Sequence, residues 1–251
     1  IPAEMNDPDS RVARRLAATA AIVALLGACS VITKVDDPVN LFTVTPKSTF
    51  DSGLPTVRWQ LIVETPSAAA NINSGRIALQ MTPTSSDYYA QSAWVDRAPL
   101  MVQTRAVESF ENSKRIVGVG RDPVAVRANY ILQTELREFQ AEYFHGGAPI
   151  VRVRVVSRLV RMPDRQIVGA AAFERCWRAR ADKIPEVVKA FDEALGSVLK
   201  RLVSWTLTAV PPYVPQEGVP LPVPRGGDAG IDNSAGCPKP GQVIETPVVQ
   251  D

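Results

Sequence analysis

The thiol of Cys29 is the side chain of this sequence with the clearest chemical context. Three arginines lie within residues 11–15, an apolar run covers residues 16–26, and the small residues Gly27 and Ala28 stand directly before the cysteine. A positively charged start, a short apolar run and small residues before a cleavage point are the parts of an export signal.

Residues 1–29 together resemble a bacterial lipoprotein signal. The resemblance implies cleavage after Ala28, which makes Cys29 the new N-terminal residue, and a lipid on the thiol of Cys29. The apolar run is too short to span a bilayer comfortably, because a span takes about 20 apolar residues. The alternative is a buried helix that happens to contain Cys29. Charged residues and prolines flank the run at 7–9 and 36–38, and these flanks disfavour a buried helix.

Ser30 follows the cysteine. In the lipoproteins that this segment resembles, serine rather than aspartate at this position permits transfer to the outer membrane. Each buried CH₂ group contributes about 0.8 kcal/mol, so two or three acyl chains hold a protein on a membrane almost permanently. We therefore expect the mature chain on the periplasmic face of the outer membrane, bound to it through its acyl chains.

The rest of the sequence offers little for catalysis or metal binding. His145 is the only histidine, so it is the single candidate for a Ser-His-Asp triad or a histidine metal site. Residues 145–147, His-Gly-Gly, resemble an esterase oxyanion loop, but no Gly-x-Ser-x-Gly elbow supplies a nucleophile, and we interpret them as a hairpin loop. Residues 118–120, Gly-Val-Gly, lack the third glycine of a dinucleotide motif and predict a strand that ends in a turn. We expect no catalytic residue, no cofactor and no metal.

The charge of the chain excludes some partners. The formal net charge is +2, and residues 1–28 contain three charges of each sign, so the mature chain keeps this value. Such a balance is not that of a nucleic-acid-binding protein. The carboxylates of Glu135, Glu138 and Glu142 alternate with Arg137 on or near one predicted strand, and we interpret them as a solvated ladder of opposite charges.

Three arginines share one face of a predicted strand whose other face is apolar. They are Arg152, Arg154 and Arg158. Guanidinium groups bind carboxylates and phosphates in bidentate fashion, so these residues could form a surface for an acidic partner or for lipid phosphates. The alternative is an ordinary polar sheet face that pairs with Glu135 and Glu138 of the neighbouring strand.

Two cysteines remain after Cys29. An exported chain meets an oxidising compartment, so Cys176 and Cys237 could form a disulfide that ties the tail to the domain. The alternative is a buried free thiol at Cys176, which has apolar neighbours in the sequence.

The pattern of apolar and turn-forming residues predicts both strands and helices. We expect early strands at 41–44, 57–63, 77–81 and 88–94, with a hairpin between the last two. Three longer strands are expected to form an antiparallel meander, at 129–143, 149–161 and 166–177. Helices are expected at 99–110 and 183–207, and the second has a long apolar stripe with Pro185 in its first turn.

These elements predict an α+β fold with a mainly antiparallel sheet and two helices packed on it. The remaining segment, 210–251, contains nine prolines, so it is expected to be an extended or disordered tail. We divide the chain into a lipoprotein signal peptide (1–28), a lipidated cysteine and tether (29–38), a domain (39–209) and this proline-rich tail.

Taken together, the segments resemble the ABC-type transport auxiliary lipoprotein family. The resemblance spans about residues 29–207, and four segments behind the signal cysteine carry it: 41–44, 88–99, 132–139 and 188–195. It implies a non-enzymatic outer-membrane partner of a transporter that combines a separate ATPase and permease with a lipid-binding protein of the mammalian-cell-entry type. It also implies traffic of phospholipids or other hydrophobic molecules.

A second hypothesis comes from a different class. Tethered α+β lipoproteins of similar build regulate cell-wall or envelope synthesis, and a proline-rich arm suits either task. Adjacent genes for a permease, an ATPase and a lipid-binding protein would favour transport, whereas an adjacent murein synthase would favour regulation. A homo-oligomer is compatible with both hypotheses.

We expect Cys29→Ser to give a folded chain that is released from the membrane, because nothing beyond residue 30 is apolar enough to hold a bilayer. The measurement is fractionation of cells into membrane and soluble parts. The variant is exported with a cleavable signal in place of residues 1–28, so that an uncleaved signal cannot retain it. Recovery of this variant in the membrane pellet would contradict a lipid anchor at Cys29.

Overall fold

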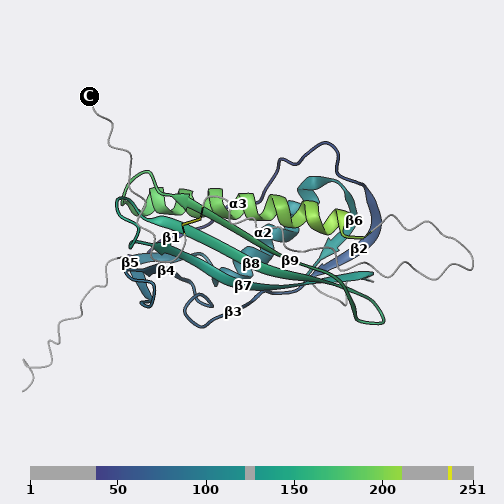
Figure 1. Ribbon diagram of the computed structural model, residues 1–251, viewed down its shortest axis with the longest axis horizontal. Helices are drawn as coiled ribbons and strands as arrows, with labels where there is room; N and C mark the ends of the chain where they lie inside the picture. Colours follow the sequence, from purple (N-terminus) through teal and green to yellow (C-terminus); the bar gives the residue numbers. More distant parts are fainter. Residues whose placement is uncertain (1–37, 122–127, 211–236, 239–251) are drawn as a thin grey trace, which may run out of the picture. The chain divides into compact units, whose positions relative to one another are not determined.

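A computed structural model describes residues 38–121, 128–210 and 237–238 of the protein (Figure 1). The predicted signal peptide, nearly all of the tether and most of the proline-rich tail lie outside these residues. The chain from Val39 onward forms one unit. Its described elements are, in order, β1 (Asn40–Phe42), β2 (Val57–Val63), β3 (Ser67–Ala68), β4 (Arg76–Gln80), β5 (Asp87–Trp94), α2 (Ala98–Ser113), β6 (Ile116–Gly120), β7 (Tyr130–Glu142), β8 (Ile150–Arg161), β9 (Gln166–Arg178) and α3 (Ile184–Thr208).

The sheet is built around β7, which is 13 residues long. One edge of β7 pairs along its length with antiparallel β8, which pairs in turn with antiparallel β9. The other edge takes three short parallel strands in succession: β2 at residues 130–132, β3 at 135–136 and β4 at 140–142. β6 extends the sheet beyond β2, and β5 and β1 extend it beyond β4.

The α+β class is confirmed, but the expectation of a mainly antiparallel sheet is wrong, because the nine strands form a mixed sheet. The meander of β7, β8 and β9 and the antiparallel pairing of β4 with β5 agree with the prediction. Turn residues between consecutive strands reveal antiparallel neighbours in a sequence. Parallel pairs need longer crossover connections and leave no such local signal.

Both helices lie on one face of the sheet, and the apolar core fills the space between the layers (Figure 1). α3 runs along β8 and β9, while α2 packs against β2, β6 and α3. Pro185 stands in the first turn of α3, where the missing N–H group costs no hydrogen bond. Neither helix of the described chain has the length and hydrophobicity of a transmembrane span.

Three aromatic rings join the two layers. Phe191 of α3 is fully buried, and its ring centre lies 5.1 Å from that of Trp94 on β5 and 4.8 Å from that of Phe139 on β7. The rings of Trp94 and Phe139 are 5.5 Å apart. Pairs of this geometry contribute about 0.5–1.5 kcal/mol beyond the burial of their area, so this cluster is a major contact between helix and sheet.

A β-bulge in β7 decides which of its side chains face away from the helices. The register against β8 shifts by one residue between Leu136 and Glu138, so Arg137 is the additional residue. Leu136 and Phe139 are both in the core although they are three positions apart. Glu138 and Gln140 therefore point to the opposite, outer face of the sheet.

We expect Phe191→Ala to lower the free energy of unfolding by about 3–5 kcal/mol, because it removes the centre of the aromatic cluster and leaves a cavity. The measurement is urea denaturation, with Lys189→Ala as a control on the exposed side of the same helix. The control should change the free energy by no more than about 0.5 kcal/mol. A loss below about 1 kcal/mol for Phe191→Ala would mean that this helix face packs differently.

Candidate functional site

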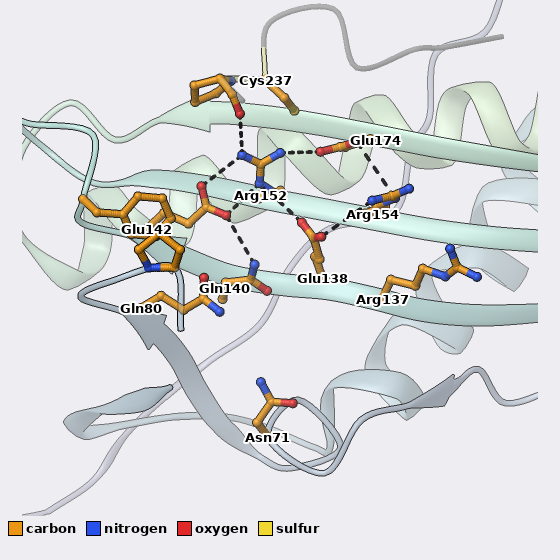
Figure 2. A pocket seen from close by; sticks show the side chains of 13 residues that line it. Asn71, Gln80, Arg137, Glu138, Gln140, Glu142, Arg152, Arg154, Glu174 and Cys237 are labelled. Carbon is orange, nitrogen blue, oxygen red and sulfur yellow. Dashed lines mark hydrogen bonds and ion pairs between the residues drawn. The ribbon is translucent and has the colours of Figure 1, made fainter. Parts of the chain in front are cut away.

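A polar groove crosses the outer face of the sheet (Figure 2). Its volume is about 460 Å³. β4, β7, β8 and β9 all contribute to its wall, and the residues that carry the argument below are Gln80, Glu138, Gln140, Glu142, Arg152, Arg154 and Glu174. We refer to this cavity as the Arg152 groove.

The register of β7, β8 and β9 arranges the floor of the groove in two rows. One row consists of Gln140, Arg152 and Cys176, and the other of Glu138, Arg154 and Glu174. Side chains that face each other on neighbouring strands have Cβ atoms about 5 Å apart. Arg154 therefore lies between two glutamates, and Arg152 lies between Gln140 and Cys176. The bulge at Arg137 is what brings Glu138 opposite Arg154.

Arg152 is the centre of the polar network in the groove. It is only 7% exposed. Its Nε donates to Glu142 Oε1 at 2.7 Å, and its Nη1 donates to Glu174. Glu138 Oε2 lies 3.3 Å from Nε. Nη2 donates to the carbonyl oxygen of Pro238 at 2.8 Å, so the guanidinium also binds the C-terminal tail.

Burial and ion pairing act on the charged groups of the groove in opposite directions. Burial favours a lower pKa for Arg152, but the hydrogen bonds and charges of Glu142 and Glu174 outweigh it, so the pKa of Arg152 is raised above its ordinary value. Burial also raises the pKa of Glu138, although Arg152 and Arg154 partly oppose this effect. The cluster holds Arg152 in its charged form.

His145 joins the same network from the hairpin between β7 and β8. Its side chain is 1% exposed, and its Nε2 lies 2.8 Å from Glu142 Oε2. The hairpin interpretation of residues 145–147 agrees with the structure, since Gly146 and Gly147 both have a φ of +69°, a conformation that glycine adopts without strain. The sequence did not indicate the contact between His145 and Glu142, because residue types alone do not determine the direction in which the hairpin points the imidazole.

The solvated ladder predicted for the glutamates is correct only in part. Glu135 pairs with Arg137 at 3.2 Å, and both side chains are exposed. Glu142, by contrast, is 3% exposed and lies under Arg152 and His145. The prediction failed there because simple alternation along β7 ignores the bulge and the hairpin that covers the strand end.

The three arginines, for which the sequence allowed either a partner surface or a polar face paired with neighbouring glutamates, have different environments. Arg152 is buried among carboxylates, Arg154 is half-buried near Glu138 and Glu174, and Arg158 is exposed. A buried, paired guanidinium is not accessible to a partner, so Arg152 does not belong to such a surface. Arg158 remains accessible, beside a second hollow of about 250 Å³.

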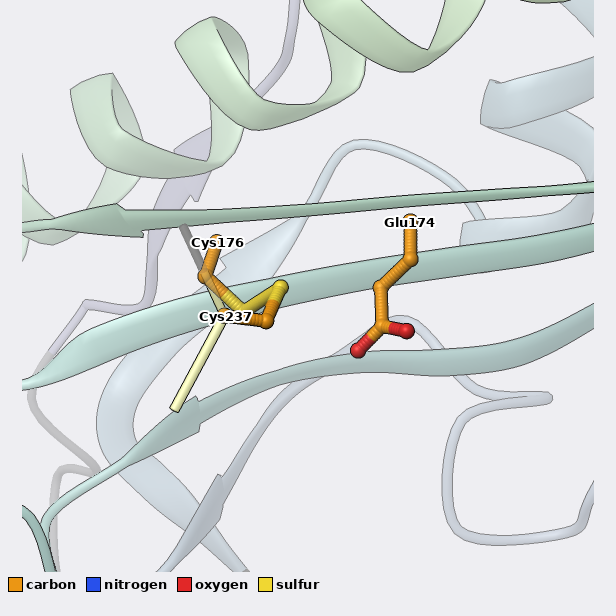
Figure 3. Close-up of side chains that lie close together, drawn as sticks. All are labelled: Glu174, Cys176 and Cys237. Atoms are coloured by element: carbon orange, nitrogen blue, oxygen red, sulfur yellow. A yellow bond between two sulfur atoms is a disulfide. The ribbon is translucent and has the colours of Figure 1, made fainter. Parts of the chain in front are cut away.

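The structure brings Cys176 and Cys237 together as a disulfide (Figure 3). Their Cα atoms are 4.9 Å apart, although 61 positions separate them in the sequence. Cys176 lies beside Arg152 in the first row of the groove, so the bond places Pro238 where Arg152 can reach its carbonyl group.

Within the described residues, one group of His, Cys, Asp and Glu side chains is close enough to share a metal ion. This group consists of Glu174, Cys176 and Cys237. Their ligand atoms lie within 4.8 Å of one another. A thiol binds a metal as the thiolate. The two sulfurs are bonded to each other and Glu174 pairs with Arg152, so this arrangement does not favour a metal ion.

The chemistry of the Arg152 groove suits the binding of polar groups. Among its lining residues, Arg137, Arg152 and Arg154 balance Glu138, Glu142 and Glu174 in charge. An acyl chain in this cavity would displace water from the partly exposed side chains of Arg137, Glu138 and Arg154 without supplying polar contacts in its place. The carbonyl group that the groove binds in this structure is that of Pro238 in the chain's own tail. Cys29 and Ala28, the predicted lipid-attachment and cleavage residues, lie outside the described residues.

Comparison with known proteins identifies relatives of this sequence and fold. The family described as ABC-type transport auxiliary lipoprotein component matches residues 40–203. An uncharacterized protein of Bradyrhizobium diazoefficiens, bll6063, is 26% identical over 155 residues. This match covers 62% of the chain but only 41% of the length of that relative.

Solved structures show the same fold. Protein XCC0632 of Xanthomonas campestris, from family DUF330, is 30% identical and has a TM-score of 0.65, with 68% of this chain and 96% of that protein covered. A second solved structure, of an uncharacterized protein, is 13% identical with a TM-score of 0.53, and covers 66% of this chain and 97% of its own. At that identity the second likeness concerns the fold alone.

We expect Arg152→Met to lower the free energy of unfolding by about 3–5 kcal/mol, because it leaves buried carboxylates without their cation. Arg158→Met is the matched control, since it changes an exposed arginine of the same strand and face. The control should change the free energy by no more than about 0.5 kcal/mol. Equal effects of the two substitutions in urea denaturation would show that Arg152 is not the centre of a buried network.

The tail is expected to stabilise the domain through Cys237. A chain that ends at Val210 loses the disulfide and should be less stable by about 2–4 kcal/mol. A chain that ends at Pro238 keeps the disulfide and should unfold at the same temperature as the full chain. Thiol counting on the denatured full chain provides the second measurement. Free thiols at both Cys176 and Cys237, together with equal stability of the two truncated chains, would contradict the covalent attachment.

Proposed function

The chain belongs to the family of ABC-type transport auxiliary lipoprotein components, and from this premise we propose that it is the outer-membrane component of such a transport system. In this proposal it is a non-catalytic lipoprotein of the periplasm. Its transporter has a separate permease and ATPase and moves phospholipids or other hydrophobic molecules. The partner that contacts it is a lipid-binding protein of the mammalian-cell-entry type.

The observation that carries this proposal is the extent of the family match. Residues 40–203 run from the first described strand to the last turns of α3, so the match includes the whole sheet and both helices. The members of this family are auxiliary components of transport systems, and the family is not a catalytic one. We therefore propose that the protein attaches to the membrane and contacts its partner. A rigid two-layer domain can do both without catalysing a reaction.

The Arg152 groove supports the role of an adaptor and not of a lipid carrier. The charged groups that line it bind one another and the carbonyl group of Pro238. Burial of a transported acyl chain would require an apolar cavity. We therefore propose that the hydrophobic cargo moves along the lipid-binding partner, and that this chain fixes the outer-membrane end of the path.

Attachment to the membrane is proposed to occur through acyl chains on Cys29. The tether of residues 30–38 reaches about 30 Å at most when fully extended. A domain held by such a short tether works close to the lipid surface, which suits a component that receives or delivers lipid at that membrane. A homo-oligomer would place several such domains around one transport path.

Arg158 is proposed as part of the surface that meets an acidic segment of the partner. We expect Arg158→Glu to reduce recovery of the lipid-binding protein at least about fivefold in co-purification, because it places like charges opposite each other. Arg180→Glu, which also reverses an exposed arginine, is the matched control and should leave recovery unchanged.

The same experiment tests the proposed function as a whole. Recovery of the lipid-binding protein, permease and ATPase with the wild-type chain is the expected result. Recovery of a murein synthase in their place would overturn the transport proposal and favour regulation of cell-wall synthesis. If the transporter is recovered equally with both variants, the system is correct but Arg158 is not at the contact.

A further inference from the structure

Three exposed aliphatic side chains lie together at the edge of the sheet where the described chain begins. Val39, Leu41 and Val95 are 54%, 63% and 54% exposed. Leu41 is the sheet partner of Ala93. The amide of Val95 donates to the carbonyl oxygen of Phe42 at 2.9 Å, so Val95 continues the pairing of β1 with β5. We call Val39, Leu41 and Val95 the β1 patch.

The β1 patch points away from the helices. Phe42 and Trp94 are sheet partners, and both pack in the core. Side chains alternate between the two faces of a strand. Leu41 directly precedes Phe42 and Val95 directly follows Trp94, so these two side chains face outward. Val39 lies two positions before Leu41 and is exposed as well.

The patch is the place where exposed apolar side chains gather in the described chain. Seven large hydrophobic side chains are exposed in the part of the chain that the structure describes, and three of these seven form the patch. The other four are Met81, Val117, Ile167 and Trp177. A single exposed apolar residue needs no explanation, whereas a group of neighbouring ones is a candidate contact surface.

A cation stands beside the patch. Arg76 of β4 is the sheet partner of Ala93, which is itself the partner of Leu41, so these residues form one row across three strands. The guanidinium carbon of Arg76 lies 3.7 Å from the ring centre of Tyr88, which holds the group in position. Aliphatic side chains next to an arginine match the surface of a phospholipid bilayer, where acyl chains lie below phosphate groups.

The course of the chain indicates which apolar partner is near. Val39 belongs to the patch, and Cys29 precedes it by ten positions. Ten extended residues reach about 33 Å at most. A membrane that holds acyl chains on Cys29 therefore lies within this distance of the patch. The patch is not covered by any other part of the described chain.

We propose that the β1 patch rests on the lipid surface to which Cys29 is attached, with its aliphatic side chains at the acyl boundary and Arg76 at the level of the phosphates. This inference rests on the proposed lipid anchor. It adds an orientation for the domain, in which the outer face of the sheet rests on the membrane at the end that contains β1, β4 and β5. The end with β2 and β6 faces away, toward the periplasm.

The opposite end of the sheet offers a matched control. β4 pairs with residues 140–142 of β7 and β2 with residues 130–132, so the two ends are about 30 Å apart at 3.3 Å per residue. Val117 of β6, next to β2, is 65% exposed. It resembles the patch residues in chemistry and exposure but lies at the end that should not touch lipid.

The test uses the full lipidated chain in vesicles of phosphatidylethanolamine and phosphatidylglycerol. Leu41→Cys, Val95→Cys and Val117→Cys each carry an environment-sensitive fluorophore, and some of the lipids carry a nitroxide quencher on their acyl chains. We expect quenching of at least about twofold at positions 41 and 95, and almost none at position 117. Unchanged unfolding temperatures show that the variants are folded.

Two results would overturn the proposal. Equal quenching at all three positions would mean that the domain has no preferred orientation on the membrane. A shielded label at positions 41 and 95 that lipid does not quench, and that stays shielded in the Cys29→Ser chain in solution, would mean that a second copy covers the patch.

The mass of the N-terminal peptide separates this proposal from the proposed function. An acylated Cys29 supports the anchor, whatever the quenching shows. If Cys29 carries no lipid, the anchor proposal fails, and the chain is then coupled at Cys29 to a maleimide lipid and measured again. The quenching pattern in that sample tests the patch by itself.

Discussion

The backbone of β7 must find hydrogen-bond partners on both edges over 13 residues, and the rest of the fold follows from this requirement. β8 supplies one edge in a single antiparallel run. Three short strands divide the other edge among themselves, and the remaining strands attach to these. The two helices then cover the apolar face that this arrangement creates.

The polar site depends on the same strand. A single additional residue, Arg137, changes which side chains of β7 face outward, so that Glu138 stands opposite Arg154 and Gln140 opposite Arg152. Glu142, two positions further along the strand, reaches Arg152 through its side chain. A guanidinium buried among carboxylates is stable only when each carboxylate is in place. The register of β7 thus determines both the packing of the core and the network around Arg152.

Local patterns in the sequence were sufficient for the helices, the hairpin and the meander, because apolar periodicity and turn residues report on neighbours along the chain. The bulge and the five parallel pairings were missed, since they depend on strands that are far apart in the sequence. The same limit explains the groove. Arg152 was identified as a surface residue, but its burial requires β9, the hairpin at His145 and the tail to converge on it. For Cys176 the sequence allowed both a disulfide and a free thiol, because spacing alone does not determine connectivity.

The disulfide also makes a covalent ring of the chain between Cys176 and Cys237, and α3 lies inside this ring. The helix leaves β9 at one end, and the segment that follows it returns to β9 through Cys237. If α3 separates from the sheet, it remains attached at both ends to the strand that it covers. The effective concentration of α3 near the sheet therefore stays high. Return of α3 to the sheet is then favoured over binding of its apolar stripe to another molecule.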